Sequence, residues 1–121
     1  MGTHCYIGIE ETDGTVRFIF IHYDGYFCHI IPMLRKYYAT RENVKRLIEY
    51  GNKSILCLPH ELSEETIDED EKPQTVAHRY AFEELVHHKI EYYYLFTKED
   101  KWLCQTSQMM DIDMIHYDHE K

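Results

Sequence analysis

A group of polar and aromatic side chains, His22-Tyr23-Asp24-Gly25-Tyr26, follows directly on an apolar run and is the first candidate for chemistry. An imidazole, a carboxylate and phenols can line a pocket for a polar ligand, so His22, Asp24 and Tyr26 are candidate ligand-binding residues. A structural alternative stays open. Asp24-Gly25 favours a turn in which Asp24 accepts backbone hydrogen bonds, while the His22 side chain finds its hydrogen-bond partners at a strand end.

Basic residues gather in the next part of the chain as candidate phosphate ligands: Arg35, Lys36, Arg41, Lys45 and Arg46. Guanidinium groups bind phosphate through paired hydrogen bonds, and a helix that begins among these residues would offer its N-terminal amides to an anion. The alternative is a solvated helix surface on which Glu42 and Glu49 pair with the cations.

An aromatic run nearer the C-terminus can stack a nucleobase: Tyr92, Tyr93, Tyr94 and Phe96, with Trp102 beyond. Side chains alternate along a strand, so one face belongs to the core and only Tyr93, or Tyr92 with Tyr94, can face outward. We take Tyr93 as the candidate for ligand contact. Packing in the core or in a subunit interface is the alternative.

Nine histidines and four cysteines raise the question of a metal site. The densest groups are Cys28-His29, His87-His88 and His116–His119, and none has the paired spacing of a zinc site. The chain has no glycine-rich phosphate loop or nucleophile elbow, and a pairing of Cys28 with His22 or His29 has no further support. We therefore expect no metal, no cofactor and no catalytic residue.

The clearest scaffold element is an N-terminal β-hairpin. Apolar runs over 4–10 and 16–23 flank Asp13-Gly14, whose glycine allows the positive φ of a tight turn. A second Asp-Gly, Asp24-Gly25, ends the second strand and brings His22 and Tyr26 to one end of the sheet.

Two helices are predicted next. The first lies within Cys28–Tyr38 and should begin between residues 28 and 31, because Pro32 fits only a first turn. Thr40 is a good N-cap for the second, whose apolar stripe ends before Gly51.

The second half of the chain is predicted to supply a second hairpin. Residues 54–58 are predicted to form an edge strand or a packed connection, followed by an acidic exposed loop over 60–74 and a helix over 75–88. The paired strands of the hairpin are expected over 89–97 and 101–106. The tail over 109–121 is expected to be an edge strand or a docked extension. Together these elements predict a single α+β domain over 1–121. Its antiparallel sheet would be built from the N-terminal and C-terminal β-hairpins, with two or three helices on one face.

Composition narrows the possible partners. The net charge of −9 disfavours direct binding to nucleic acid. No apolar run has the length of a membrane span, and the N-terminus lacks the features of a signal peptide. The four cysteines are scattered singly, which favours free thiols and a reducing, cytoplasmic location.

The first half of the chain resembles a family of small phage-encoded proteins. The motifs that carry the resemblance are Met1-Gly2-Thr3, Ile7-Gly8 with Glu10, Asp13-Gly14, His22-x-Asp24-Gly25-Tyr26, Leu34, Tyr38, Val44-Leu47-Ile48 and Gly51. Two features depart from the family pattern: Phe27 replaces a proline, and the glycine that usually follows is missing.

The resemblance implies a counter-defence role in the cytoplasm of the host cell. One class of such proteins, the sponges that oppose Thoeris-type immunity, binds cyclic nucleotide signals without cleaving them. The first hypothesis is therefore a non-enzymatic homo-oligomer that sequesters a cyclic nucleotide or ADP-ribose-like molecule. The basic residues Arg35, Lys36, Arg41 and Lys45 would pair with phosphate, and His22, Tyr26 and Tyr93 would contact base or ribose.

Two alternatives stay open. An acidic inhibitor that mimics nucleic acid, such as an anti-CRISPR, would bind a host defence effector through the loop that contains Glu61–Glu71. A small hydrolase or cyclase-like enzyme would need an acid/base pair that converges in a cleft.

Overall fold

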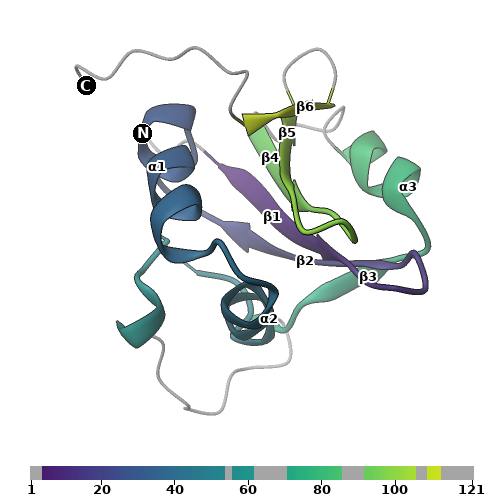
Figure 1. The fold of residues 1–121 in the computed structure, drawn as a ribbon, viewed down its shortest axis with the longest axis horizontal. Coiled ribbons are helices and arrows are strands. Elements are labelled where there is room, and N and C mark those ends of the chain that lie inside the picture. The colour runs from purple at the N-terminus through teal and green to yellow at the C-terminus, as the bar shows by residue number, and fades with distance from the viewer. Residues whose placement is uncertain (1–3, 54–55, 62–70, 86–91, 106–108, 113–121) are drawn as a thin grey trace.

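The computed structural model describes residues 4–53, 56–61, 71–85, 92–105 and 109–112 (Figure 1). The chain forms, in order, β1 (Cys5–Glu10), β2 (Val16–Ile21), α1 (Phe27–Tyr37), α2 (Arg41–Glu49), the 3-10 helix η1 (Pro59–Glu61), β3 (Gln74–Val76), α3 (Arg79–Glu84), β4 (Tyr92–Phe96), β5 (Trp102–Gln105) and β6 (Met109–Asp111). The predicted α+β class is confirmed.

The described strands form one sheet in the order β3-β2-β1-β4-β5-β6. Every neighbouring pair is antiparallel except β1 and β4, which run parallel with Ile7 opposite Tyr94. The two predicted hairpins are both present, and this parallel pair joins them. The sheet is therefore mixed at its centre, because the long connection between the hairpins returns the chain to β4 in the direction of β1.

The N-terminal hairpin has the predicted turn. Gly14 has φ of +94°, and the Asp13 carboxylate accepts a hydrogen bond from the Thr15 amide at 3.0 Å. β2 ends at Ile21, and Asp24 follows in the left-handed region with φ of +59°. The second Asp-Gly therefore ends the strand as expected.

Side-chain alternation divides the core between the two faces of the sheet. On one face α1 and α2 pack against β1 and β2 through Ile7, Ile9, Ile19, Ile21, Ile30, Ile31, Leu34, Val44, Leu47 and Ile48. On the other face α3 supplies Phe82 to a smaller cluster with Val16, Phe18, Tyr93 and Leu95. The prediction of two or three helices on one face is met by α1 and α2, while α3 lies on the opposite face (Figure 1).

The two helices of the first half lie close to their predicted positions. α1 begins at Phe27, one residue before the predicted range, so Pro32 lies in its second turn rather than its first. The Thr40 hydroxyl caps α2 by accepting from the Asn43 amide at 3.3 Å, and Gly51 follows the helix with φ of +84°. The predicted caps of α2 are thus confirmed.

The helix predicted over 75–88 is wrong at its start. Thr75 and Val76 belong to β3 and pair with Arg17 and Val16 of β2. These β-branched residues extend the sheet, and the helix begins only at Arg79. The rest of this prediction, over 86–88, lies outside the described residues.

The structure describes part of the second half of the chain. The C-terminal hairpin is confirmed over β4 and β5, and the tail begins as the edge strand β6. Leu56 is buried in a connection that has no assigned strand. Predictions for 54–55, most of the acidic loop (62–70), 89–91 and 113–121 lie outside the described residues.

All four cysteines are free thiols, as expected. Cys5 and Cys104 are buried in the core between the sheet and α1. Burial raises the pKa of the Cys5 thiol well above its ordinary value. These two cysteines therefore act as small apolar core residues.

Candidate functional site

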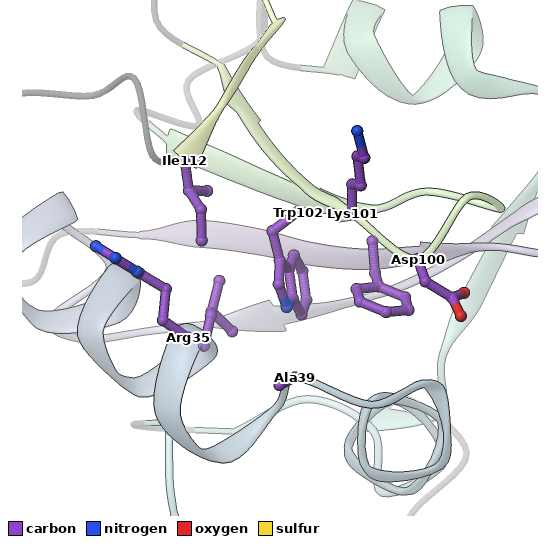
Figure 2. A pocket seen from close by; sticks show the side chains of 8 residues that line it. Arg35, Ala39, Asp100, Lys101, Trp102 and Ile112 are labelled. Carbon is purple, nitrogen blue, oxygen red and sulfur yellow. The ribbon is translucent and has the colours of Figure 1, made fainter.

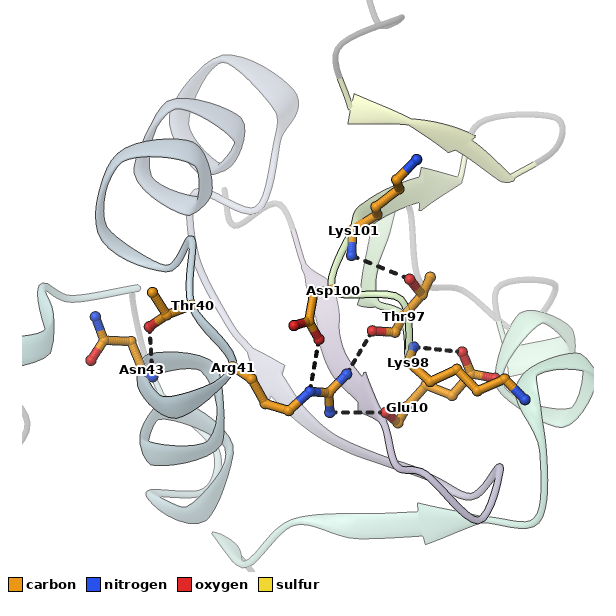
Figure 3. A network of polar contacts seen from close by, with 8 residues as sticks. All are labelled: Glu10, Thr40, Arg41, Asn43, Thr97, Lys98, Asp100 and Lys101. Atoms are coloured by element: carbon orange, nitrogen blue, oxygen red, sulfur yellow. Dashed lines mark hydrogen bonds and ion pairs between the residues drawn. The ribbon is translucent and has the colours of Figure 1, made fainter.

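Arg41 joins the start of α2 to the ends of β1 and β4 (Figure 3). Its guanidinium donates through Nη1 to the Glu10 carbonyl at 3.1 Å, through Nη2 to the Thr97 carbonyl at 2.7 Å, and through Nε to the Asp100 carboxylate at 2.9 Å. The group also lies 5.2 Å from the centre of the Phe96 ring. All three nitrogens are therefore engaged in holding the end of β1 and the β4–β5 turn against α2.

These contacts favour a structural role for Arg41 over the predicted role as a phosphate ligand. Three of its five N–H donors are already bonded to two backbone carbonyls and the Asp100 carboxylate, so a phosphate would meet only the two that remain. Carbonyls at the ends of strands need a donor when they are partly buried, and the planar fork of arginine supplies several donors at once.

Glu10 fixes the same turn from the other face of the sheet. Its buried carboxylate accepts from Arg79 Nη2 at 2.8 Å and from the Lys98 amide at 3.0 Å. Burial alone raises the pKa of Glu10, but these hydrogen bonds and the charges of Arg79 and Lys98 outweigh it and hold the pKa below its ordinary value. The carboxylate therefore stays ionised.

The β4–β5 turn is closed by its own hydrogen bonds as well. The Thr97 amide donates to the Lys101 carbonyl at 2.8 Å, and the Lys101 amide donates to the Thr97 hydroxyl at 3.3 Å. Asp100 has φ of +63°, a conformation that aspartate tolerates better than most residues. The turn thus holds Asp100 and Lys101 in fixed positions.

An open pocket of about 460 Å³ lies between the end of α1 and this turn (Figure 2). We call it the α1–turn pocket. It is lined by Leu34, Arg35, Ala39, Phe96, Asp100, Lys101, Trp102 and Ile112. Figure 2 shows Arg35 at one end of the pocket and Asp100 at the other, with Trp102 between them.

The floor of the α1–turn pocket is rigid and apolar. The Trp102 indole is only 6% exposed and donates through Nε1 to the Tyr38 carbonyl at 2.8 Å. Its ring centre lies 5.1 Å from that of Phe96 in an edge-to-face arrangement. A ligand can therefore meet only the small exposed part of Trp102, and neither ring has a full face open for stacking.

The charged rim of the α1–turn pocket favours a negative ligand. Arg35 and Lys101 are exposed cations, while the Asp100 carboxylate is paired with Arg41. The lining therefore carries two cationic side chains and one carboxylate that is paired with Arg41. Such a rim can hold an anionic group beside an apolar body.

Arg35 is the one predicted basic residue that lines this pocket. Lys36, Lys45 and Arg46 are exposed on the helices. The Lys36 ammonium lies 5.3 Å from the Tyr37 ring centre, and Arg46 donates to the Pro59 carbonyl at 3.5 Å. For these three residues the geometry matches the solvated helix surface that the sequence left as the alternative.

The predicted His22, Asp24 and Tyr26 lie at the opposite end of the sheet from the turn. β1 has six residues and rises about 3.4 Å at each, so its two ends lie roughly 17 Å apart. His22 follows β2 beside the start of β1, where its carbonyl accepts from the His4 ring at 2.8 Å. None of the three residues lines the α1–turn pocket, so the predicted site is not brought together as a whole.

The assignment of Tyr93 as a ligand contact is also corrected. Tyr93 is 0% exposed and packs edge-on against Phe82 of α3, with ring centres 4.8 Å apart. Burial raises the pKa of its hydroxyl. Alternation turns Tyr93 outward only if one face of β4 meets solvent, whereas β4 is a central strand with a core cluster on each face.

Two residues of the α1–turn pocket were missed as ligands by the sequence analysis. Asp100 and Lys101 appeared only as parts of a polar turn and a returning strand. The available signal was the position of this turn, directly after an aromatic strand and before Trp102. It did not indicate that the turn would face the end of α1.

Comparisons of the chain with protein-family models, with curated proteins and with solved structures find no match. Within the described residues, no group of three or more histidine, cysteine or acidic side chains is arranged to hold a metal ion. No helix in the same part of the chain is long and apolar enough to cross a membrane.

Proposed function

We propose that this protein binds and sequesters a nucleotide-like anionic small molecule in the α1–turn pocket, without cleaving it. The observation that carries the proposal is the pairing of an apolar floor with Arg35 and Lys101 at the rim of one pocket. Its volume of about 460 Å³ falls within the usual range of small-molecule sites.

Each part of the ligand has a counterpart in this pocket. Arg35 and Lys101 would pair with phosphate, and the Asp100 carboxylate would accept hydrogen bonds from ribose hydroxyls or a base amino group. The exposed Ala39 and the small accessible part of Trp102 would meet the apolar body of the ligand. This combination suits a cyclic nucleotide or an ADP-ribose-like molecule.

The biological role in this proposal is phage counter-defence, as the resemblance of the first half of the chain implies. Removing a host immune signal from solution requires tight binding and no turnover. An open pocket favours a second copy of the chain that would enclose the ligand, so the proposal includes a homo-oligomer in the host cytoplasm.

Titration calorimetry with cyclic ADP-ribose tests the proposal on the full chain. We expect Arg35→Ala and Lys101→Ala each to weaken binding at least tenfold, the effect of losing a charge-assisted hydrogen bond. Lys45→Ala is the matched comparison, because it removes an exposed ammonium from α2 outside the pocket. Equal losses in all three variants would contradict specific binding in this pocket, because Lys45 lies outside it.

Native mass spectrometry of the protein purified from bacterial cells gives an independent test. An excess mass that matches a nucleotide would support the proposal and identify the ligand class. A protein that carries no ligand, binds no cyclic nucleotide and shifts in mass only with host proteins would contradict it. That result would favour the acidic protein-binding inhibitor.

A further inference from the structure

A second pocket, of about 340 Å³, lies beside α3 and shares no lining residue with the α1–turn pocket. We call it the α3 pocket. It is lined by Glu10, Gly14, His78, Arg79, Tyr80 and Lys98. These residues come from the N-terminal hairpin, the start of α3 and the β4–β5 turn, so three separate parts of the chain converge on it.

Two cationic side chains reach the α3 pocket. Arg79 is held in place by its hydrogen bond from Nη2 to Glu10, and its side chain remains 31% exposed. Because only one of its nitrogens is used in this ion pair, the guanidinium can present further donors to a ligand. Lys98 is exposed and extends from the turn beside the Glu10 carboxylate, in a different direction from Lys101 (Figure 3).

Two rings complete the lining. Tyr80 is 72% exposed, far more than a tyrosine that serves the core. The His78 ring centre lies 6.1 Å from that of Tyr80. His78 Nδ1 accepts a hydrogen bond from the Ala81 amide at 3.2 Å, so the proton of the neutral ring is on Nε2, which can donate to a ligand.

The charges around the α3 pocket restrict what it can bind. Glu10 is satisfied by Arg79 and the Lys98 amide, which leaves a positive lining. The hydrogen bond to Glu10 is the main cause that raises the pKa of Arg79, and the nearby carboxylates of Glu83 and Glu99 raise it further. These two carboxylates also weaken any long-range attraction of anions to the pocket. Binding must therefore depend on direct contact with both the cations and the rings.

We propose that the α3 pocket is a second ligand site, which takes a small aromatic anion such as an aryl phosphate. The anionic group would contact Arg79, Lys98 and His78, and the aromatic ring would lie against Tyr80. The site lies on the sheet face that carries α3, whereas the α1–turn pocket borders α1 on the opposite face.

An NMR titration of the full chain with phenyl phosphate tests this second site. We expect a Kd of about 1 mM or tighter, with the largest amide shifts at residues 78–80 and 98. Tyr80→Ala and Lys98→Ala should each weaken binding at least fivefold. Both side chains are exposed, so an otherwise unchanged amide spectrum will confirm that the variants fold.

Matched ligands and a matched variant separate this site from the first. Phenol and inorganic phosphate should each bind several times more weakly than phenyl phosphate, and Lys101→Ala should leave the affinity unchanged. An absence of shifts, equal binding of inorganic phosphate, or shifts confined to Arg35 and Lys101 would overturn the proposal. Because the variants of the two pockets differ, either proposal can fail without the other.

Discussion

The two ends of the central strands use polar residues in opposite ways. At the C-terminal end of β1, Arg79 donates a hydrogen bond to the buried carboxylate of Glu10, and Arg41 donates one to the Glu10 carbonyl. At its N-terminal end, His22 is exposed and Asp24 lies in a left-handed turn. One end fixes the relative positions of four elements, whereas the other ends a strand and starts a helix.

This difference shows why residue type alone does not identify a ligand site. Arg41 and Arg35 are six positions apart and looked equivalent in the sequence. Arg41 reaches two strand-end carbonyls that need donors, while Arg35 points along the rim of a pocket (Figure 2). Only the packing of α2 against the β4–β5 turn separates the two roles.

The largest change in stability is expected when Arg41 is removed. Arg41→Ala deletes three hydrogen bonds and the contact with Phe96, so we expect the free energy of unfolding to fall by about 2–3 kcal/mol. Arg41→Lys should recover only part of this loss, because one ammonium cannot bond all three acceptors. Urea unfolding measures both values.

Arg46→Ala is the control for the loss of one positive charge, since Arg46 is exposed on the same helix and donates a long hydrogen bond, at 3.5 Å, to the Pro59 carbonyl. We expect this control to change stability by no more than about 0.5 kcal/mol. If Arg41→Ala were as stable as Arg46→Ala, the structural role of Arg41 would be wrong and its assignment as a ligand would return.

The sequence predicted the local elements better than their arrangement. The hairpin turn at Asp13-Gly14 and the helix caps at Thr40 and Gly51 depend only on the backbone of neighbouring residues. These positions were therefore predicted correctly. The parallel pairing of β1 with β4 depends on contacts between residues far apart in the chain, and no local pattern encodes it. The same pairing buries Tyr93, which is why its assignment as an outward residue failed.

The candidate site was predictable to a smaller extent. The basic character around Arg35 was visible, but the pocket also needs Lys101 and Trp102, more than 60 positions further on. Likewise, the ionised and buried Glu10 looked like an ordinary strand residue, because its partners Arg79 and Lys98 lie in two other elements. Sites assembled by long-range packing leave little trace in residue spacing.

A smaller effect is expected for Glu10→Gln, and it should depend on pH. The folded pKa of Glu10 is below its unfolded value, so its ionised form stabilises the protein above the ordinary glutamate pKa of about 4.3. That contribution is lost as pH falls through the folded pKa. At neutral pH we expect Glu10→Gln to lose about 1–2 kcal/mol, since the amide keeps an acceptor but no charge.

Unfolding free energies of the wild type and Glu10→Gln should therefore converge as the pH falls from 7 to below about 4. The exposed Glu42 provides a control, because Glu42→Gln removes a solvent-exposed carboxylate at the start of α2. A difference between wild type and Glu10→Gln that stayed constant with pH would show that the charge of Glu10 is not what stabilises the turn.

The smallest effect is expected at the other end of the sheet. His22 is exposed, and its hydrogen bond to His4 is made by its backbone carbonyl, which any residue retains. His22→Ala loses ring contacts at an exposed position, of which the edge-to-face contact with Phe20, at 4.5 Å between ring centres, is shorter than those with His4 and Tyr23, so stability should change by no more than about 0.5 kcal/mol. Affinity for cyclic ADP-ribose should also match the wild type, because His22 lies outside the α1–turn pocket. A variant with wild-type stability but no binding would place the ligand at the His22-Asp24-Tyr26 corner, and the exposed end of the sheet would then be the functional one.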